Sequence, residues 1–247
     1  MPYNTIIYSS KAHIASITMN RPSAGNAVNQ QLAQEMEEVC SRINQEDDIY
    51  VVTLIGASDT FCSGADKDIE AGLSHPAAAV AGIDRPVVAA INGDALGLGL
   101  EIALSCDIRI ASDRARFGLP QVARGHIPMD GGTQRLPRII GRGKALELLM
   151  TAEIITASEA LEIGLVSRIV PPGALAGEVD KLAETIAAKG PIALRYLKEA
   201  VNKGLDMTLE QGLRLEADLY FLLHTTADRT EGIKSYLEKR KPKYKGK

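Results

Sequence analysis

Two glycine-bearing turns, each a short distance after an apolar segment, constrain the fold of this chain more than any other feature. Val51–Ile55 is followed by Phe61-Cys62-Ser63-Gly64-Ala65-Asp66, and Val87–Ile91 by Asn92-Gly93-Asp94-Ala95-Leu96-Gly97-Leu98-Gly99-Leu100-Glu101. Short apolar runs of this kind are typical of parallel strands that are buried on both faces. Glycine lets the main chain turn sharply and lets a ligand approach the backbone closely. The pattern therefore predicts an α/β sheet with two ligand-accessible turns.

The second turn leads into a helical pattern from Leu98 to Cys106. A helix that begins there directs free backbone N–H groups and its positive end toward the crevice at the strand ends. Two such turns suit a carbonyl oxygen that becomes an oxyanion, where the loss of one donor commonly costs about 3–4 kcal/mol. Either turn alone is better explained as a tight connection, so the functional interpretation depends on the motifs below.

The rest of the pattern predicts an α/β core over residues 1–190 and a helical region over residues 191–247. Gly190-Pro191 divides them, because proline cannot continue a helical hydrogen-bond ladder. In the core we expect a strand hairpin, an amphipathic helix and a third buried strand: Thr5–Tyr8 with Ala12–Met19, Gln30–Ile43 and Ile108–Ala111. The later helices are expected at Ala157–Ile163, Ala176–Ala188, Ile192–Lys203, Leu209–Leu223 and Asp228–Glu238.

Composition excludes several classes of function. The net charge of the 247 residues is −3, so no general basic field attracts nucleic acid or an anionic membrane. The three cysteines lack Cys-x-x-Cys spacing and the four histidines are scattered, which argues against disulfides and a zinc site. No apolar run reaches the roughly 18–20 residues of a membrane span, and the N-terminus does not resemble a targeting peptide. We therefore expect a reduced, metal-free cytoplasmic protein.

A series of motifs resembles the crotonase (enoyl-CoA hydratase/isomerase) superfamily over nearly the whole chain. Their order and spacing match the family: Asn20-Arg21-Pro22, Asn26-Ala27, Ser63-Gly64-Ala65-Asp66, Arg85-Pro86-Val87-Val88-Ala89-Ala90-Ile91-Asn92-Gly93, Cys106-Asp107-Ile108-Arg109-Ile110-Ala111, Phe117-Gly118-Leu119-Pro120, Gly131-Gly132-Thr133-Gln134-Arg135-Leu136-Pro137-Arg138, Gly164-Leu165-Val166 and Lys239-Arg240-Lys241-Pro242. The resemblance implies the ClpP/crotonase spiral of ββα units, with a C-terminal helical trimerisation region. It also implies an acyl-CoA thioester substrate, no separate cofactor, and a homotrimer or a dimer of trimers.

Carried onto this chain, the family's oxyanion-hole donors are the backbone N–H groups of Ala65 and Leu98. The positions implied to bind substrate and coenzyme A are Ser23, Ala24, Gly64, Asp66, Lys67, Gly97 and Tyr244. Six of the nine residues in Lys239–Lys247 are basic. This tail is either a solvated, frayed end or a segment that reaches the nucleotide of a neighbouring subunit.

Glu101 lies where hydratases of this family carry one of two catalytic glutamates, and a carboxylate there can take a proton from water. The alternative is a first-turn glutamate favoured by the helix dipole, an effect of about 0.3–1 kcal/mol. The second family glutamate should follow Pro120, but the chain has Gln121. An amide can bind water yet cannot exchange protons near neutral pH. Ordinary two-glutamate hydration would thereby lose about 3–5 kcal/mol.

Asp130 is a candidate replacement, since it resembles an aspartate before paired glycines in dihydroxynaphthoyl-CoA synthases and lies one position from the catalytic aspartate of dienoyl-CoA isomerases. With Glu101 it would form an acid/base pair of unequal pKa values. Alternatively, it caps the helix expected to start near Gly131. His126 is interpreted as a packing or surface residue, with a pocket-facing role as the alternative. The interval from Asp66 to Arg85 is shorter than in common hydratases, so the acyl-pocket wall cannot be transferred from the family.

The leading functional hypothesis is an enoyl-CoA hydratase that acts on a 2-enoyl-CoA or dienoyl-CoA. In it, Glu101 activates water, and Asp130 or a water held by Gln121 helps to protonate Cα. The alternatives are an enoyl- or dienoyl-CoA isomerase or other crotonase-type lyase, and an acyl-CoA-binding homologue with impaired catalysis. A Clp-type serine protease is disfavoured because the chain lacks a convincing Ser/His/Asp set.

Overall fold

A six-stranded sheet forms the centre of the computed structural model, which describes residues 3–66 and 75–247. The strand order is β1-β2-β3-β4-β6-β9; β1 and β2 pair antiparallel, and every later neighbour is parallel. The mostly parallel sheet predicted from the apolar runs is therefore confirmed. Its strands are β1 (Ile6–Lys11), β2 (Ile14–Met19), β3 (Val51–Gly56), β4 (Val87–Ile91), β6 (Ile108–Ser112) and β9 (Arg168–Val170).

The hairpin turn lies later than expected. Ser9, Ser10 and Lys11 continue β1 instead of dividing the two strands, and the chain turns at Ala12 and His13 with φ of 50° and 66°. β1 is an edge strand whose later residues are largely exposed, so polar side chains fit there as well as in a turn. Polarity alone therefore placed the turn wrongly.

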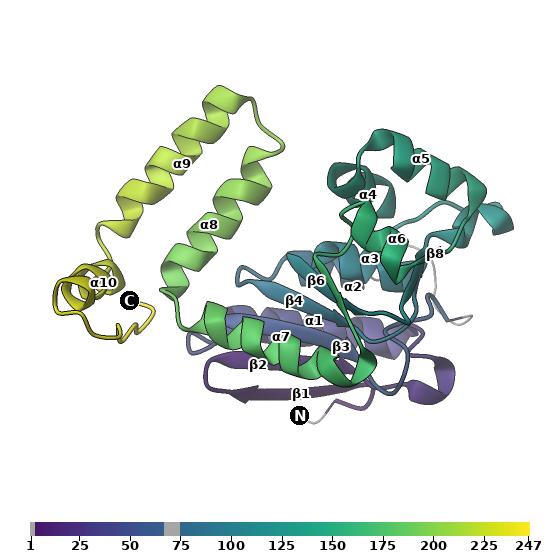
Figure 1. Cartoon of the computed structure of the whole chain (residues 1–247), viewed down its shortest axis with the longest axis horizontal. Coiled ribbons are helices and arrows are strands. Elements are labelled where there is room, and N and C mark those ends of the chain that lie inside the picture. The colour runs from purple at the N-terminus through teal and green to yellow at the C-terminus, as the bar shows by residue number, and fades with distance from the viewer. Residues whose placement is uncertain (1–2, 67–74) are drawn as a thin grey trace.

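Helices cover both faces of the sheet (Figure 1). α7 (Pro172–Ala187) packs on one face, where Leu175, Val179 and Ala183 meet residues of β3, β4 and β6. The opposite face belongs to the larger core, which includes α1 (Gln30–Gln45). Because side chains alternate along a strand, apolar residues on both faces of β3 and β4 suit a sheet covered on both sides.

Successive segments alternate between this sheet and a smaller one, in the order β5-β7-β8. The chain passes from β4 to β5 and α3, from β6 to β7, and from β8 through α6 to β9, which is the expected spiral of ββα units. The elements of this part are α2 (Pro76–Ala81), β5 (Ala95–Leu96), α3 (Leu98–Ser105), β7 (Arg116–Gly118), η2 (Pro120–Arg124), α4 (Gly132–Ile140), α5 (Arg142–Thr151), β8 (Ile155–Thr156) and α6 (Ala157–Glu162); the short η1 (Pro22–Ala24) precedes α1.

The last three helices project from the sheet as an arm (Figure 1): α8 (Pro191–Gly204), α9 (Leu209–Leu223) and α10 (Ala227–Leu237). α8 begins at Pro191, as the helix break predicted, and α9 matches its expected bounds. α7 was expected only from Ala176 but begins at Pro172, because proline is well accommodated in the first turn of a helix. The division of the chain at residue 190 stays a prediction.

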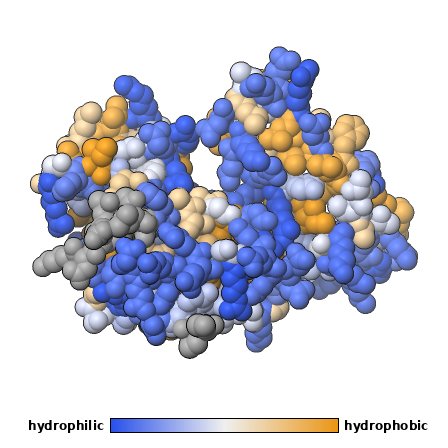
Figure 2. Space-filling model, turned by 180° about the vertical axis from the view of Figure 1, so that it is seen from behind, coloured by the Kyte–Doolittle hydropathy of each residue, from blue (hydrophilic) through white to orange (hydrophobic). Residues whose placement is uncertain are grey.

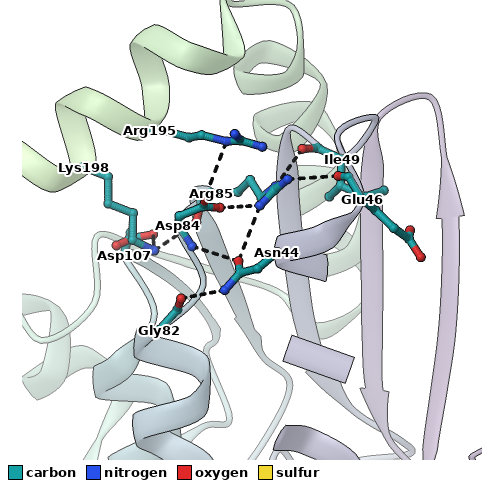
Figure 3. A network of polar contacts seen from close by, with 9 residues as sticks. All are labelled: Asn44, Glu46, Ile49, Gly82, Asp84, Arg85, Asp107, Arg195 and Lys198. Carbon is teal, nitrogen blue, oxygen red and sulfur yellow. Dashed lines mark hydrogen bonds and ion pairs between the residues drawn. The ribbon is translucent and has the colours of Figure 1, made fainter. Parts of the chain in front are cut away.

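Polar contacts join α8 to the core (Figure 3). Lys198 Nζ lies 2.8 Å from an Asp107 carboxylate oxygen and donates to the carbonyl of Arg85 at 2.9 Å. Arg85 is 1% exposed, and its guanidinium donates to the carbonyls of Ile49 and Glu46 at 3.0 Å each. A guanidinium removed from water needs such partners. The network therefore fixes the base of the arm against the sheet.

The basic tail is held in place, so its interpretation as a frayed end was wrong. The Asp228 carboxylate accepts hydrogen bonds from the backbone N–H groups of Lys245 and Gly246 at 2.7 and 2.9 Å. Glu231 accepts one from the Lys243 N–H at 2.7 Å. Two acidic side chains of α10 thus satisfy backbone donors that a solvated end would offer to water.

The helices of the described residues were also compared with the length and hydropathy of a membrane span. None of them has a stretch that meets both requirements.

Candidate active site

The tertiary structure brings the two glycine turns together. Cys62 N–H donates to the Asp94 carbonyl at 2.9 Å, and Leu96 N–H donates to the Cys62 carbonyl at 3.0 Å. Gly97 has φ 53° and ψ −122°, which favours glycine strongly. A side chain at Gly99 would collide with the Cys62 carbonyl. These glycines therefore let the start of α3 approach the first turn directly.

The predicted oxyanion-hole donors are both available. The peptides flanking Ala65 bond to Val28: Val28 N–H donates to the Gly64 carbonyl and Asp66 N–H to the Val28 carbonyl, each at 2.8 Å. In a parallel bridge of this kind, the N–H of the central residue, Ala65, points away from the Val28 segment. Leu98 is the first residue of α3, where an N–H has no intrahelical partner. Within the described residues, neither N–H has a hydrogen-bond partner.

The Asn20-Arg21-Pro22 and Asn26-Ala27 motifs support the first turn. Asn26 is completely buried, and its amide donates to the carbonyls of Ala57 and Thr60 at 2.9 and 2.7 Å. Its side-chain oxygen accepts from the Arg21 N–H at 2.9 Å. Arg21 also forms an ion pair with Asp66 at 2.8 Å. The residues around Ala65 are thus held by polar contacts that are largely shielded from water, which favours a preorganised backbone donor.

Glu101 is 1% exposed and lies in the first turn of α3. Its Oε1 accepts from the backbone N–H groups of Asp130 and Gly132 at 2.7 and 2.9 Å, and its Oε2 lies 3.4 Å from Gln121 Nε2. Burial raises the pKa of Glu101 above the ordinary glutamate value. A raised pKa brings a carboxyl group nearer to neutrality, where it can both accept and donate a proton. The helix dipole alone requires neither this burial nor these contacts.

Asp130 is 5% exposed, and its carboxylate holds the start of α2. Oδ2 accepts from the Ala77 N–H at 2.6 Å and Oδ1 from the Ala78 N–H at 3.2 Å, with His75 Nδ1 3.6 Å from Oδ1. The expectation that Asp130 caps the helix near Gly131 was wrong. α4 has Gly131 as its N-cap without a side-chain cap, whereas Asp130 caps a helix more than 50 residues earlier.

Only the main chain of Asp130 contacts Glu101, through its N–H. Burial raises the pKa of the Asp130 carboxyl against the opposing effect of the Ala77 and Ala78 hydrogen bonds. Because both carboxylate oxygens already have partners, they favour a structural role for the side chain. A catalytic role for Asp130 stays an untested prediction.

The residues implied to bind coenzyme A divide into two groups. Ser23 and Ala24 form the short helix η1 beside the first turn, where Ser63 Oγ donates to the Ala24 carbonyl at 3.3 Å. Gly64, Asp66 and Gly97 belong to the two turns themselves, while Lys67 lies outside the described residues. Tyr244 does not join them within this chain: its ring packs beside Gly190 and Gly232, at the base of the arm. Any contact between Tyr244 and substrate therefore depends on a neighbouring subunit.

Sequence reasoning missed the two N–H groups that hold Glu101. They belong to Asp130 and Gly132, on either side of Gly131, which has φ 104°. The paired glycines were the available signal, but only the fold shows that their backbone faces α3. His126 is exposed, in agreement with its interpretation as a surface residue.

Two other kinds of site lack support in the described residues. No group of three His, Cys, Asp or Glu side chains there has the geometry to hold a metal ion. Cys62 lies inside the first turn, but it is fully buried, and burial raises the pKa of its thiol to about 12. A thiol with that pKa is protonated at neutral pH and is a poor nucleophile.

Comparison with known proteins agrees with this geometry. A family model described as enoyl-CoA hydratase/isomerase matches residues 9–247. The crotonyl-CoA hydratase of Syntrophomonas wolfei is 39% identical, with 99% of each chain covered, and the short-chain-enoyl-CoA hydratase of Clostridium acetobutylicum is 38% identical over 98% of this chain and 97% of its own. The crystal structure of an enoyl-CoA hydratase from Bacillus anthracis superposes with a TM-score of 0.93 at 40% identity, covering 99% of this chain and all of that one. The chain therefore belongs to the enoyl-CoA hydratase/isomerase family.

Proposed function

We propose that this enzyme adds water to the double bond of a 2-enoyl-CoA thioester, with a short acyl chain as the first substrate to test. The observation that carries the proposal is the combination of two N–H groups that have no hydrogen-bond partner within the described residues, at Ala65 and Leu98, with the buried carboxyl group of Glu101. Relatives named crotonyl-CoA hydratase and short-chain-enoyl-CoA hydratase support the same reaction.

In the proposed reaction, the thioester carbonyl oxygen accepts hydrogen bonds from Ala65 N–H and Leu98 N–H. Water attacks Cβ as its proton passes to the Glu101 carboxylate. The electron pair of the double bond moves toward the thioester, and the carbonyl oxygen becomes the enolate oxygen. Donors already fixed at the position of the developing charge lower the barrier because they need no reorganisation during the reaction.

Hydration is measured as the loss of enoyl absorbance when the protein is incubated with crotonyl-CoA and longer 2-enoyl-CoA or dienoyl-CoA substrates. We expect Glu101→Gln to lower kcat by about 10²–10⁴-fold, the usual contribution of a proton-transfer group. Absence of hydration across the panel, or wild-type activity of Glu101→Gln, would refute the proposal. Incorporation of deuterium without net hydration would instead indicate the isomerase alternative, and tight acyl-CoA binding without turnover an impaired homologue.

We further propose that the arm joins copies of this chain into a homotrimer or a dimer of trimers. Hydrophobic residues gather on the arm in Figure 2, and several large apolar side chains there are at least half exposed: Leu197, Val201, Leu205, Leu209, Leu213, Phe221 and Leu222. An exposed patch of this kind is typical of a protein interface. Sedimentation analysis is expected to give a mass of three or six chains; a monomer at micromolar concentration would refute the assembly.

We also propose the cytoplasmic location that the sequence predicts. Cell fractionation tests it, and recovery of the protein in a membrane or secreted fraction would refute it.

A further inference from the structure

The side-chain amide of Gln121 combines a contact to the proposed base with an unsatisfied oxygen. Nε2 lies 3.4 Å from Glu101 Oε2, whereas Oε1 is buried without a hydrogen-bond partner in the described residues. Gln121 is the residue that stands where the family pattern has its second glutamate. An unsatisfied buried polar atom is uncommon in folded proteins and costs stability. Its presence beside a catalytic group therefore calls for an explanation other than folding.

Glu101 determines the orientation of this amide. A carboxylate accepts hydrogen bonds and cannot donate them, so the nitrogen of Gln121 is the atom that faces Oε2. The opposite orientation would place two oxygens together and leave the nitrogen unsatisfied instead. The contact is long, and contacts of this kind commonly tighten only when substrate is bound.

The two carboxylate oxygens of Glu101 have different surroundings. Oε1 accepts two backbone hydrogen bonds, at 2.7 and 2.9 Å, from Asp130 and Gly132, whereas Oε2 lies 3.4 Å from the amide nitrogen of Gln121; the Met129 backbone adds a smaller effect that lowers the pKa of the Glu101 carboxyl. A well-bonded oxygen is a weaker base than one with a single long contact. Oε2 is therefore the oxygen suited to proton transfer, and Gln121 is the side chain that fixes it.

In the described part of the chain, the other charged or titratable side chains near Glu101 do not offer a free second carboxylate. The described carboxyl group whose charge acts on Glu101 is that of Asp130, and its oxygens hold the Ala77 and Ala78 N–H groups of α2. Beyond it lie His75, next to Asp130, and Arg135, whose guanidinium donates to the Asp130 carbonyl at 2.8 Å. Among residues 3–66 and 75–247, Glu101 is thus left as the one carboxyl group near the two turns with an oxygen available to the reaction.

We propose that Glu101 is the single proton carrier of this enzyme and that Gln121 is a positioning residue that holds its Oε2. This inference rests on the proposed hydration. Water loses one proton to Oε2 as its oxygen bonds to Cβ. The O–H bond of the resulting Glu101 carboxylic acid then breaks, its proton bonds to Cα, and the enolate electron pair forms that C–H bond as the thioester carbonyl is restored. The carboxylate is regenerated, and the elements of one water molecule have been added.

A structural and a positioning role for Gln121 predict opposite effects of Gln121→Met, which keeps the length of the side chain but removes both polar atoms. If Gln121 is a positioning residue, removal of the unsatisfied oxygen leaves stability unchanged or higher, while the lost Nε2 contact impairs Glu101. We expect kcat for hydration to fall about 10- to 100-fold with KM changed by less than about twofold. Gln45→Met, at the exposed end of α1, is the matched control and should resemble the wild type.

The pH dependence gives a second readout. The wild type should lose kcat/KM at low pH through one ionisation, that of Glu101, without an alkaline limb from a second carboxylic acid. Gln121→Met removes a donor to the ionised form of Glu101, so the acidic limb should move to higher pH. Gln121→Glu places a second carboxyl group beside Oε2; two such groups share a proton and should titrate in two coupled steps.

The positioning role is overturned if Gln121→Met has a wild-type kcat and pH profile, or if it loses stability and activity together while KM rises. The single-carrier role is overturned if the wild type shows an alkaline limb that Asp130→Asn abolishes. The Glu101 carboxyl titration, followed by ¹³C NMR with Glu101→Gln for assignment, separates this inference from the proposed function. A wild type that hydrates no enoyl-CoA refutes hydration and the proton path, whereas an unchanged Glu101 titration in Gln121→Met refutes the positioning role.

Discussion

Gly132→Ala tests directly whether the backbone that follows Asp130 holds Glu101. A methyl group at this position would lie 2.8 Å from Pro128 Cβ, 3.1 Å from Leu119 Cδ1 and 3.2 Å from Glu101 Cγ. Carbon atoms pack best at about 3.5–4.0 Å, so at least one of these neighbours must move by several tenths of an ångström. Gly132 begins α4 and is not among the glycines with positive φ, so the substitution creates a packing conflict without backbone strain.

Overpacking of this size typically costs about 1–3 kcal/mol of stability. Displacement of α4 also lengthens the 2.9 Å hydrogen bond from Gly132 N–H to Glu101 Oε1. Burial raises the pKa of Glu101, and the hydrogen bond from Gly132 opposes this effect. Loss of the hydrogen bond should therefore raise the pKa of Glu101 further. In the proposed reaction Glu101 acts as the carboxylate, so the acidic limb of the kcat/KM profile should shift to higher pH. A misplacement of this kind should lower kcat about 10- to 100-fold.

The assay combines urea unfolding with hydration kinetics across pH. Gly177→Ala is the matched control, because Gly177 is exposed within α7 and a methyl group there meets no atom within 4 Å. The control should keep wild-type kinetics and gain about 0.5–1 kcal/mol, the usual advantage of alanine over glycine inside a helix. If Gly132→Ala has the kcat and pH profile of the wild type, the Gly132 backbone does not position Glu101.

Three further substitutions, with Lys203→Met as a control for the last, test the remaining contacts. The pKa of Glu101 is raised in the folded protein, so its contribution to stability is greatest below the ordinary glutamate range and is lost as the pH rises through the folded pKa. Glutamine does not titrate. In urea-unfolding measurements, Glu101→Gln should therefore become more stable relative to the wild type as the pH is raised over this range. Asp130→Asn retains one acceptor for two N–H groups and should cost about 1.5–3 kcal/mol of stability; a loss of kcat below tenfold supports the cap of α2, whereas a loss above about 100-fold at unchanged stability supports catalysis. Lys198→Met removes the contact to Asp107 at the base of the arm and should lower stability by about 1–3 kcal/mol. Lys203→Met, at an exposed site, should change stability by less than about 1 kcal/mol, and equal effects of the two lysine variants would contradict the anchoring role.

Local features of the sequence were enough to predict the α/β fold, the parallel strands and the two glycine turns. Each of these depends on neighbouring residues: apolar runs specify buried strands, and glycines permit a turn at a known position. The assignment of the oxyanion-hole donors to Ala65 and Leu98 came from the family resemblance; the glycine turns by themselves indicated free backbone N–H groups at a turn and at a helix start. Element boundaries were less reliable where polarity or proline admits two interpretations, as at Ser9–Lys11 and Pro172.

The roles of side chains that act across long sequence separations were decided only by the tertiary structure. Asp130 has the sequence context of an N-cap, yet it caps α2 instead of the following helix, because the fold places two N–H groups of a distant segment against its carboxylate. The orientation of the Gln121 amide depends on Glu101, twenty residues earlier, and the basic tail is held by acidic side chains of α10. A hydrogen bond depends on where two groups meet in space, and the local pattern of either segment does not contain that information.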